Sequence, residues 1–189
     1  ADVAFAGTLN EFQQAAHDAA VAALQRDGGC VVVRRAGGGK TVIGIRLCLT
    51  LGRRCLVLVH KSPLVEQWKE RIRAFAPAAT IGEIRQHKAD VDADIVIGMV
   101  QSLARRDYGG RFANFGPGLA DECHAGCAPV FFSVLCKVAP RYLVGLTATI
   151  DRADGLTHLI HHGLGDAVDT NADAAAARQR VHVHTLQYT

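Results

Sequence analysis

Apolar residues along the chain gather in short continuous runs that alternate with longer stretches of helical spacing. The short runs are rich in Val, Ile and Leu, which is typical of strands buried on both faces of a sheet. They fall at residues 30–33, 55–59, 94–98 and 142–146. The stretches that favour helices cover residues 13–24, 42–51 and 130–138. Because strand and helix signals alternate, we predict an α/β fold, a mainly parallel β-sheet with helices on both faces.

A further helix is predicted to begin at Ser62 and Pro63. Serine suits the N-cap, and proline suits the first helical position, where its missing N–H is not needed. Leu64, Trp68 and Ile72 then follow at intervals of four residues and mark one apolar face. The indole of Trp68 is of a kind that stacks on nucleic-acid bases, but its place on this face favours a position in the core.

The composition is that of an ordinary globular protein. Of 189 residues, 49% are hydrophobic and 21% are charged, which excludes a disordered chain, a collagen and a small disulfide scaffold. A chain of this length can bury a sizeable core. No apolar run approaches the roughly 18–20 residues of a membrane span. The net charge of +3 permits nucleic-acid binding without requiring it.

Six cysteines are spread along the chain, and none forms a C-x-x-C pair. Cys30, Cys48 and Cys55 lie in or beside apolar runs, where a free thiol packs as a small core residue. The first twelve residues lack a basic segment followed by an apolar stretch, so no secretory signal is visible. We therefore expect free thiols and an intracellular, reducing compartment, either the cytoplasm or the nucleus.

The strongest single motif is GGGKT at residues 37–41, between a predicted strand and a predicted helix. Glycines let backbone N–H groups turn toward phosphates, and the helix N-terminus adds donors and a favourable dipole. Lys40 is expected to reach the β- and γ-phosphates, and the Thr41 hydroxyl to bind Mg²⁺. The strict pattern G-x-x-x-x-G-K-[ST] is broken at its first position by Arg34, so a glycine-rich turn without a ligand is the alternative.

Two adjacent carboxylates, Asp121 and Glu122, follow the phosphate loop by about eighty residues. At the end of a strand, one carboxylate of such a pair can bind a metal ion while the other acts on a water molecule. Asp121 would hold Mg²⁺ through water, and Glu122 would orient and deprotonate the attacking water. His124 lies two residues further on and would sense the γ-phosphate. A surface Asp-Glu pair beside a loop histidine is the alternative, and the presence of the phosphate loop favours the functional interpretation.

Six short segments stand out in order along the chain. They are LNEFQQ at 9–14, AGGGKT at 36–41, LVHKSPLVEQW at 58–68, IGMVQS at 97–102, DECH at 121–124 and GLTAT at 145–149. Together they resemble the first RecA-like motor domain of superfamily 2 DExH-box helicases and translocases. Within that superfamily the chain is most similar to xeroderma-pigmentosum-B-type helicases and to restriction-enzyme motor subunits, whose R-x-D-G-L it matches at 152–156.

The resemblance implies ATP hydrolysis coupled to movement on, or unwinding of, nucleic acid. DNA is favoured over RNA, and the sequence leaves the choice open. Its cofactors would be ATP and Mg²⁺, with the Mg²⁺ held by Thr41 and Asp121. The catalytic residues would be Lys40, Asp121 and Glu122. The nucleotide-binding residues would be Gln13, which reads adenine, and Ala36, Gly37, Gly38, Gly39, Lys40 and Thr41. The residues coupling hydrolysis to movement would be His124, Thr147 and Thr149. The nucleic-acid contacts would be Lys61, Pro63, Gln101 and Ser102.

The resemblance also implies a division of the chain. We expect a RecA-like ATP-binding domain over residues 1–170 and the start of a linker over residues 171–189. The linker would lead to a second RecA-like domain that supplies arginine fingers and is absent from this chain. The isolated chain is then expected to be weakly active.

The sequence departs from the family pattern at several positions. Arg34 replaces a small residue, Ala36 a threonine, and Ile150 a proline. The strand before the carboxylates reads FGPGLA at 115–120, and because proline suits a central strand poorly, we expect that strand to begin near Gly118. Two alternative functions remain open. One is a duplex translocase subunit of a nuclease machine, and the other is a nucleotide-binding interaction module without useful turnover.

Overall fold

Helices and strands alternate along the chain in the order that the apolar pattern predicts. The computed structural model describes residues 3–52, 54–122, 128–148 and 164–169. The elements are α1 (Glu11–Asp27), β1 (Gly29–Val33), α2 (Lys40–Thr50), β2 (Arg54–Val59), α3 (Ser62–Phe75), β3 (Ile81–Arg85), β4 (Lys88–Ala89), β5 (Ile95–Met99), α4 (Val100–Arg105), the short 3-10 helix η1 (Gly109–Phe112), β6 (Phe115–Asp121), α5 (Ala128–Val138), β7 (Tyr142–Thr147) and β8 (Ala167–Asp169). Each predicted element is confirmed, and β3, β4, α4, η1 and β8 are additional.

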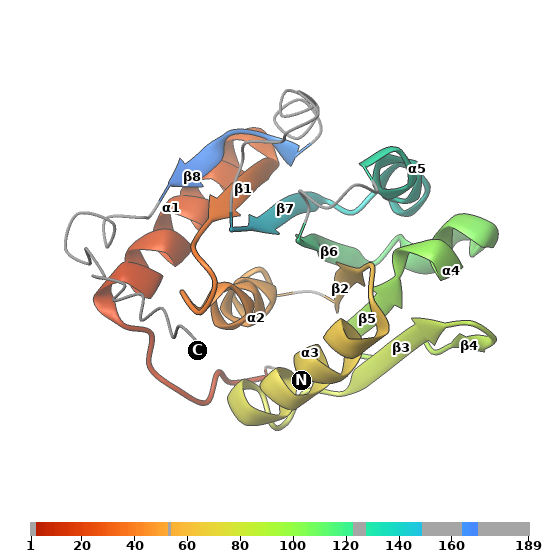
Figure 1. Cartoon of the computed structure of the whole chain (residues 1–189), viewed down its shortest axis with the longest axis horizontal. Coiled ribbons are helices and arrows are strands. Elements are labelled where there is room, and N and C mark those ends of the chain that lie inside the picture. Colours follow the sequence, from red (N-terminus) through yellow and green to blue (C-terminus); the bar gives the residue numbers. More distant parts are fainter. Residues whose placement is uncertain (1–2, 53, 123–127, 149–163, 170–189) are drawn as a thin grey trace, which may run out of the picture.

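The described strands form one eight-stranded sheet in the order β4-β3-β5-β2-β6-β7-β1-β8 (Figure 1). Neighbouring strands pair in parallel except β3 and β4, which form an antiparallel hairpin. The predicted, mainly parallel α/β sheet is therefore confirmed. Because the strands run parallel, the carboxyl ends of β1, β2, β5, β6 and β7 meet at one edge of the sheet, the edge at which open α/β sheets bind ligands.

Helices cover both faces of the sheet. Figure 1 shows α1, α2 and α3 on one face and α4 and α5 on the other. The first group closes an apolar core that contains Leu24, Ile43 and Trp68. The second group closes a separate core that contains Leu103 and Val134. In the described part of the chain, no helix is long and apolar enough to cross a membrane.

Strand β6 is longer than predicted, because it begins at Phe115 and not near Gly118. The expectation rested on Pro117, which lacks the N–H that a central strand needs. The pairing of β6 with β2 shifts in register just there, so that Arg54 pairs with Phe115 and Leu56 already with Gly118. An irregularity of this kind leaves one residue out of the ladder, which is how a strand accommodates proline.

The start of α3 lies one residue earlier than predicted. Lys61 is the N-cap and makes no side-chain capping bond, and Ser62 is the first helical residue. The Ser62 hydroxyl lies 3.8 Å from the sulfur of Met99, at the end of β5. Pro63 still falls in the first turn, where its missing N–H costs no helical hydrogen bond.

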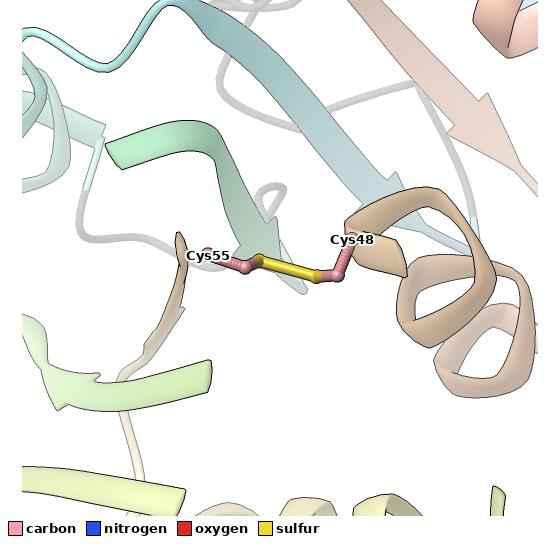
Figure 2. Close-up of a disulfide and its surroundings, with 2 residues drawn as sticks. All are labelled: Cys48 and Cys55. Atoms are coloured by element: carbon pink, nitrogen blue, oxygen red, sulfur yellow. A yellow bond between two sulfur atoms is a disulfide. The ribbon is translucent and has the colours of Figure 1, made fainter. Parts of the chain in front are cut away.

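Two of the cysteines that were expected to be free are joined to each other. Cys48, near the end of α2, and Cys55, in β2, form a disulfide within the core (Figure 2). Their Cα atoms lie 5.6 Å apart, a span that a disulfide bridges. The expectation was wrong for this pair, because an apolar pattern places each cysteine in the core without showing that the turn after α2 brings them together. Cys30 is a free thiol, and burial raises its pKa to about 12.

Some predictions concern residues outside the described ranges. These residues are the coupling candidates His124 and Thr149, Ile150, the segment 151–156, and the expected linker at 171–189. Their assignments stay predictions, as does the domain boundary at residue 170.

Candidate functional site

A hollow of about 410 Å³ opens where the loop after β1 and the end of β6 share the carboxyl edge of the sheet. Its lining includes most of the residues predicted to bind nucleotide or metal, namely Gln13, Ala36, Gly37, Gly39, Lys40, Thr41, Asp121 and Glu122. Strand β7 pairs with both β1 and β6, so one strand separates the two motifs in the sheet. The fold therefore brings together side chains that are about eighty residues apart in the sequence.

The glycines of the loop have conformations that other residues rarely adopt. Gly37 and Gly39 have φ angles of 77° and 84°, in the left-handed region. A Cβ atom at Gly39 would also collide with the side-chain amide of Gln13. Gly39 is the N-cap of α2, and the first N–H groups of a helix have no intrahelical partner. The loop is thus a backbone cradle of the kind that binds phosphate.

Lys40 is a cation that lines the hollow. It is buried, and its Nζ donates a hydrogen bond to the carbonyl of Arg34 at 3.2 Å. The same Nζ lies 3.7 Å from Oε1 of Glu122. Lys40 therefore connects the phosphate loop to the carboxylate pair across the hollow, and its role in binding the β- and γ-phosphates stays a prediction.

Arg34, which breaks the strict loop pattern, braces the loop from within. Its guanidinium is buried and donates to the carbonyls of Gly38, at 2.9 Å from Nε, and Phe12, at 3.3 Å from Nη1. Its backbone N–H donates to the Thr147 carbonyl at 2.9 Å. Arg34 thus ties the loop to the start of α1 and to the end of β7. The departure from the family pattern adds a structural bond without occupying a phosphate-binding position.

Gln13 joins the start of α1 to the phosphate loop. Its backbone N–H donates to the Asn10 side chain at 2.8 Å, and its own Oε1 accepts from the Asn10 backbone N–H at 3.0 Å. This reciprocal capping box fixes the side chain beside Gly39, at the hollow. Gln13 lines the hollow as an adenine-reading residue must, and its role in binding stays a prediction.

Asp121 ends β6 with a carboxylate that is almost fully buried. Burial raises the pKa of Asp121 above its ordinary value, and a hydrogen bond from Trp68 opposes that rise. The indole Nε1 of Trp68 donates to Oδ2 of Asp121 at 2.7 Å. Trp68 was predicted to be a core residue, and its 1% exposure confirms this and leaves no face for stacking on a base. Sequence reasoning missed its bond to Asp121.

Glu122 follows with an unusual backbone. Its φ is 53°, in the left-handed region that is costly for a residue with a side chain. The chain turns sharply here, directly after β6, and the Glu122 carboxylate lies beside Lys40. Such strain persists only where the surrounding structure holds it, and it is common at functional sites.

Thr147 ends β7, next to the loop that follows β1. It is fully buried, and it pairs with Val33, the last residue of β1. The Thr147 carbonyl accepts a hydrogen bond from the N–H of Arg34, so a movement at the end of β7 would displace the start of the phosphate loop. This placement suits a coupling residue, and the coupling itself stays a prediction.

The residues predicted to contact nucleic acid lie at the ends of β2 and β5. Lys61 and Pro63 are exposed at the start of α3. Gln101 donates from Nε2 to the carbonyl of His60 at 3.0 Å, and the Ser102 hydroxyl accepts the N–H of Gln86 at 3.0 Å. These two polar side chains therefore hold neighbouring loops in place.

A second hollow, of about 450 Å³, lies between the β3–β4 hairpin and α4. It is lined by Gln86, His87, Ser102, Arg105 and Arg106. We call it the basic hollow, because two of its lining residues are arginines and none is acidic. Arg106 Nη2 lies 3.4 Å from Nδ1 of His87. Sequence reasoning missed this hollow, because β3 and β4 were not predicted and nothing local links Gln86 to Ser102.

Helix α3 also contributes to the first hollow, the one lined by the phosphate loop and the carboxylate pair, which we call the nucleotide-side hollow. Its residues Leu64, Gln67 and Arg71 join the lining, and none of them was predicted there. Gln67 and Arg71 are four residues apart and so lie on one face of the helix. The available signal was this spacing, which begins within the segment at 58–68 that supplies the predicted nucleic-acid contacts.

The donors around the hollow suit a magnesium-bound nucleoside phosphate. They comprise a glycine loop in which Gly39 has no room for a Cβ atom, the ammonium of Lys40, the hydroxyl of Thr41 and two carboxylates. Among the described residues, no group of three His, Cys, Asp or Glu side chains could hold a metal ion. Mg²⁺ keeps several waters and is bound through one or two protein groups together with phosphate oxygens, and Thr41 and Asp121 are groups of this kind in the lining.

Relatives of the chain are helicases by name. A protein of Acanthamoeba polyphaga mimivirus, L396, named as a candidate ATP-dependent RNA helicase, is 32% identical over 165 residues, which are 87% of this chain and 32% of the relative. The helicase/translocase subunit XPB of the general transcription and DNA repair factor IIH from Antonospora locustae is 31% identical over 139 residues, 66% of this chain and 20% of that protein. The chain thus spans about a third or less of these two relatives.

Solved structures share the fold. The UvsW helicase of bacteriophage T4 superposes with a TM-score of 0.71 at 17% identity, covering 88% of this chain and 63% of UvsW. The SWI2/SNF2 ATPase core of Sulfolobus solfataricus, solved with double-stranded DNA, gives 0.69 at 16% identity over 87% of this chain and 37% of that one. The RecA-like fold is thereby shown. A family model described as "Type III restriction enzyme, res subunit" matches residues 6–152, and the chain belongs to that family of helicase-related proteins.

Proposed function

We propose that this chain is the ATP-hydrolysing motor domain of a helicase or translocase that acts on nucleic acid. The observation that carries the proposal is the meeting of the phosphate loop and the carboxylate pair, with Lys40 Nζ 3.7 Å from Glu122 Oε1. The family of the chain and the helicase names of its relatives support it. They favour a motor over a nucleotide-binding module without turnover.

In this proposal, backbone N–H groups of the loop and of the start of α2 bind the phosphates. Lys40 exchanges its bond with the Arg34 carbonyl for the β- and γ-phosphate oxygens, and its charge opposes the charge that develops there. When bound, Mg²⁺ would neutralise part of the phosphate charge, and Thr41 and Asp121 are the residues that would hold it.

Glu122 is the proposed general base. Its carboxylate lines the hollow next to Lys40, so a water between it and the γ-phosphate would be both oriented and deprotonated. Asp121 accepts a hydrogen bond from Trp68, whereas Glu122 lies beside Lys40. The two adjacent carboxylates can therefore serve different atoms.

We propose DNA as the nucleic acid, contacted by Lys61 and Pro63 at the start of α3 and by the basic hollow. The name of the XPB relative and the double-stranded DNA bound to the SWI2/SNF2 core support DNA, whereas the name of the mimivirus relative points to RNA. The arginines of the basic hollow, Arg105 and Arg106, carry the charge that phosphates require. Gln101 would act by holding the loop at His60 in position.

The Glu122→Gln substitution tests the proposal. The amide keeps the shape of the side chain but cannot accept a proton, so Mg·ATP binding should persist while single-turnover hydrolysis falls by about 100-fold or more. Glu70→Gln is the matched control, because Glu70 is exposed on α3 and should leave both quantities unchanged. Normal hydrolysis by Glu122→Gln would contradict the assignment of the base.

A further inference from the structure

Trp68 is the single tryptophan of the chain. The only polar atom of its side chain, Nε1, donates a hydrogen bond to Asp121, the candidate metal ligand. The indole is 1% exposed, and its N–H donates to Oδ2 of Asp121 at 2.7 Å. Asp121 is itself 6% exposed. A hydrogen bond between two buried groups, one of them charged, is among the stronger ones in a protein, because water cannot replace either partner.

The ring of Trp68 is held from two sides. A Cβ atom at Gly44 of α2 would lie 3.0 Å from Cη2 of Trp68 and 2.8 Å from Leu119 of β6, so the glycine makes room for close packing. Lys40 and Thr41, in the first turn of α2, belong to the same helix as Gly44. Trp68 therefore lies between the helix that carries the phosphate loop and the strand that carries Asp121.

The contact does more than fill space. A phenylalanine would occupy most of the same volume, but it would leave Oδ2 of Asp121 buried without this donor. A carboxylate can rotate about its Cβ–Cγ bond, and a fixed donor on one oxygen stops that rotation. Asp121 also lines the nucleotide-side hollow, so its orientation decides which atom it presents there.

We propose that Trp68 is a positioning residue that fixes the Asp121 carboxylate in the orientation needed to hold the cation of a bound nucleotide. The inference rests on the proposed function, in which Asp121 serves Mg²⁺. It goes further by assigning a role to a residue of α3 that is not among those lining the hollow. Trp68 acts only through Asp121.

The test is the Mg²⁺ dependence of ADP binding, measured by calorimetry with Mg²⁺ and with EDTA. Trp68→Phe should weaken ADP binding by about tenfold with Mg²⁺ and leave binding in EDTA unchanged, the size expected when a charged group loses one hydrogen bond. Ile72→Val is the packing control, because Ile72 is fully buried on the same helix and its side chain has no group that could bond to Asp121. An equal loss of affinity with and without Mg²⁺ would mean a purely structural role and would overturn the proposal.

A double-mutant cycle separates this inference from the proposed function. If Trp68 acts through Asp121, then Trp68→Phe should have no further effect on Mg²⁺ dependence in an Asp121→Asn background. Additive effects would overturn the positioning role. If Asp121→Asn alone left the Mg²⁺ dependence intact, the assignment of Asp121 to the metal would fail, and that outcome is distinct from a failure of Trp68.

Fluorescence provides a measurement that does not depend on the folding of a variant. Because Trp68 is the only tryptophan, the intrinsic emission of the wild-type chain reports on the surroundings of Asp121. Adding Mg²⁺ to the ADP complex should change this emission, and the change should follow the same Mg²⁺ concentration as the gain in ADP affinity. Emission that is unaffected by Mg²⁺ while ADP affinity rises would overturn the proposal.

Discussion

The two hollows at the carboxyl edge of the sheet are built differently. On the nucleotide side, an ammonium, a hydroxyl, two carboxylates and a glycine loop converge on one space from β1, α2 and β6. On the side of β3, β5 and α4, the polar side chains of Gln101 and Ser102 bond to backbone groups of the chain itself, and arginines line the basic hollow. In the first region the polar groups converge on one small space, whereas the second presents positive charge along a surface.

The difference teaches how tightly each function constrains its residues. A phosphate bound in a backbone cradle demands particular φ angles and a lysine at one position, so few substitutions are tolerated. A nucleic-acid backbone repeats the same charge along its length, so it can be bound by cations at many positions. Substitutions should therefore have large, local effects on the nucleotide side and smaller, graded effects on the other.

Lys40→Ala should have the largest effect. It removes the ammonium next to the phosphate loop, so ADP affinity should fall by about 100-fold or more, as expected when charge-assisted hydrogen bonds to phosphate are lost. Calorimetric titration of ADP measures this. Lys61→Ala, at an exposed position on the other side, should leave ADP affinity unchanged. Equal affinities for Lys40→Ala and the wild type would refute the phosphate-loop assignment.

Arg34→Ala should have an intermediate effect on both stability and binding. It leaves the carbonyls of Gly38 and Phe12 without this donor, so the free energy of unfolding should fall by about 2 kcal/mol and ADP affinity by about tenfold. Urea unfolding and calorimetry measure the two quantities. Arg35→Ala is the matched control, because Arg35 is the exposed neighbour. Similar losses in both variants would show that the buried guanidinium does not brace the loop.

Arg106→Ala should have the smallest effect. One lost phosphate contact should weaken duplex binding by a few-fold for every sequence, and the slope of log K against log[salt] should become shallower by about 0.9. Fluorescence anisotropy across a salt series measures this slope. Arg73→Ala is the comparison, because Arg73 lies in the last turn of α3 and does not line the basic hollow. An unchanged slope for Arg106→Ala would separate the basic hollow from the nucleic-acid path.

Much of the fold and of the nucleotide-side hollow could be predicted from the sequence, because both depend on short sequence patterns. Runs of Val, Ile and Leu mark the central strands, and the glycine loop lies between a strand and a helix. What remained hidden depends on tertiary contacts. The register shift opposite Pro117 allows β6 to begin at Phe115, and the turn after α2 joins Cys48 to Cys55.

The same limit applies to side chains with two uses. Helical spacing correctly predicts that Trp68 is buried. Only the packing of α3 on β6 shows that its indole N–H donates a hydrogen bond to Asp121. Gln101 lies in a segment that resembles a nucleic-acid-binding motif, yet its amide bonds to His60. Patterns in the sequence indicate where a residue lies more readily than which polar partner it finds.

The most direct test of the account is a crystal structure of this chain with ADP and Mg²⁺. We predict the β-phosphate against the amides of residues 37–41 and Lys40, with the metal ion between Thr41 and Asp121 and the carboxylate of Asp121 still bonded to Trp68. The nucleotide would leave the basic hollow unoccupied. ADP bound at Arg105 and Arg106, or phosphates remote from Lys40, would contradict the account.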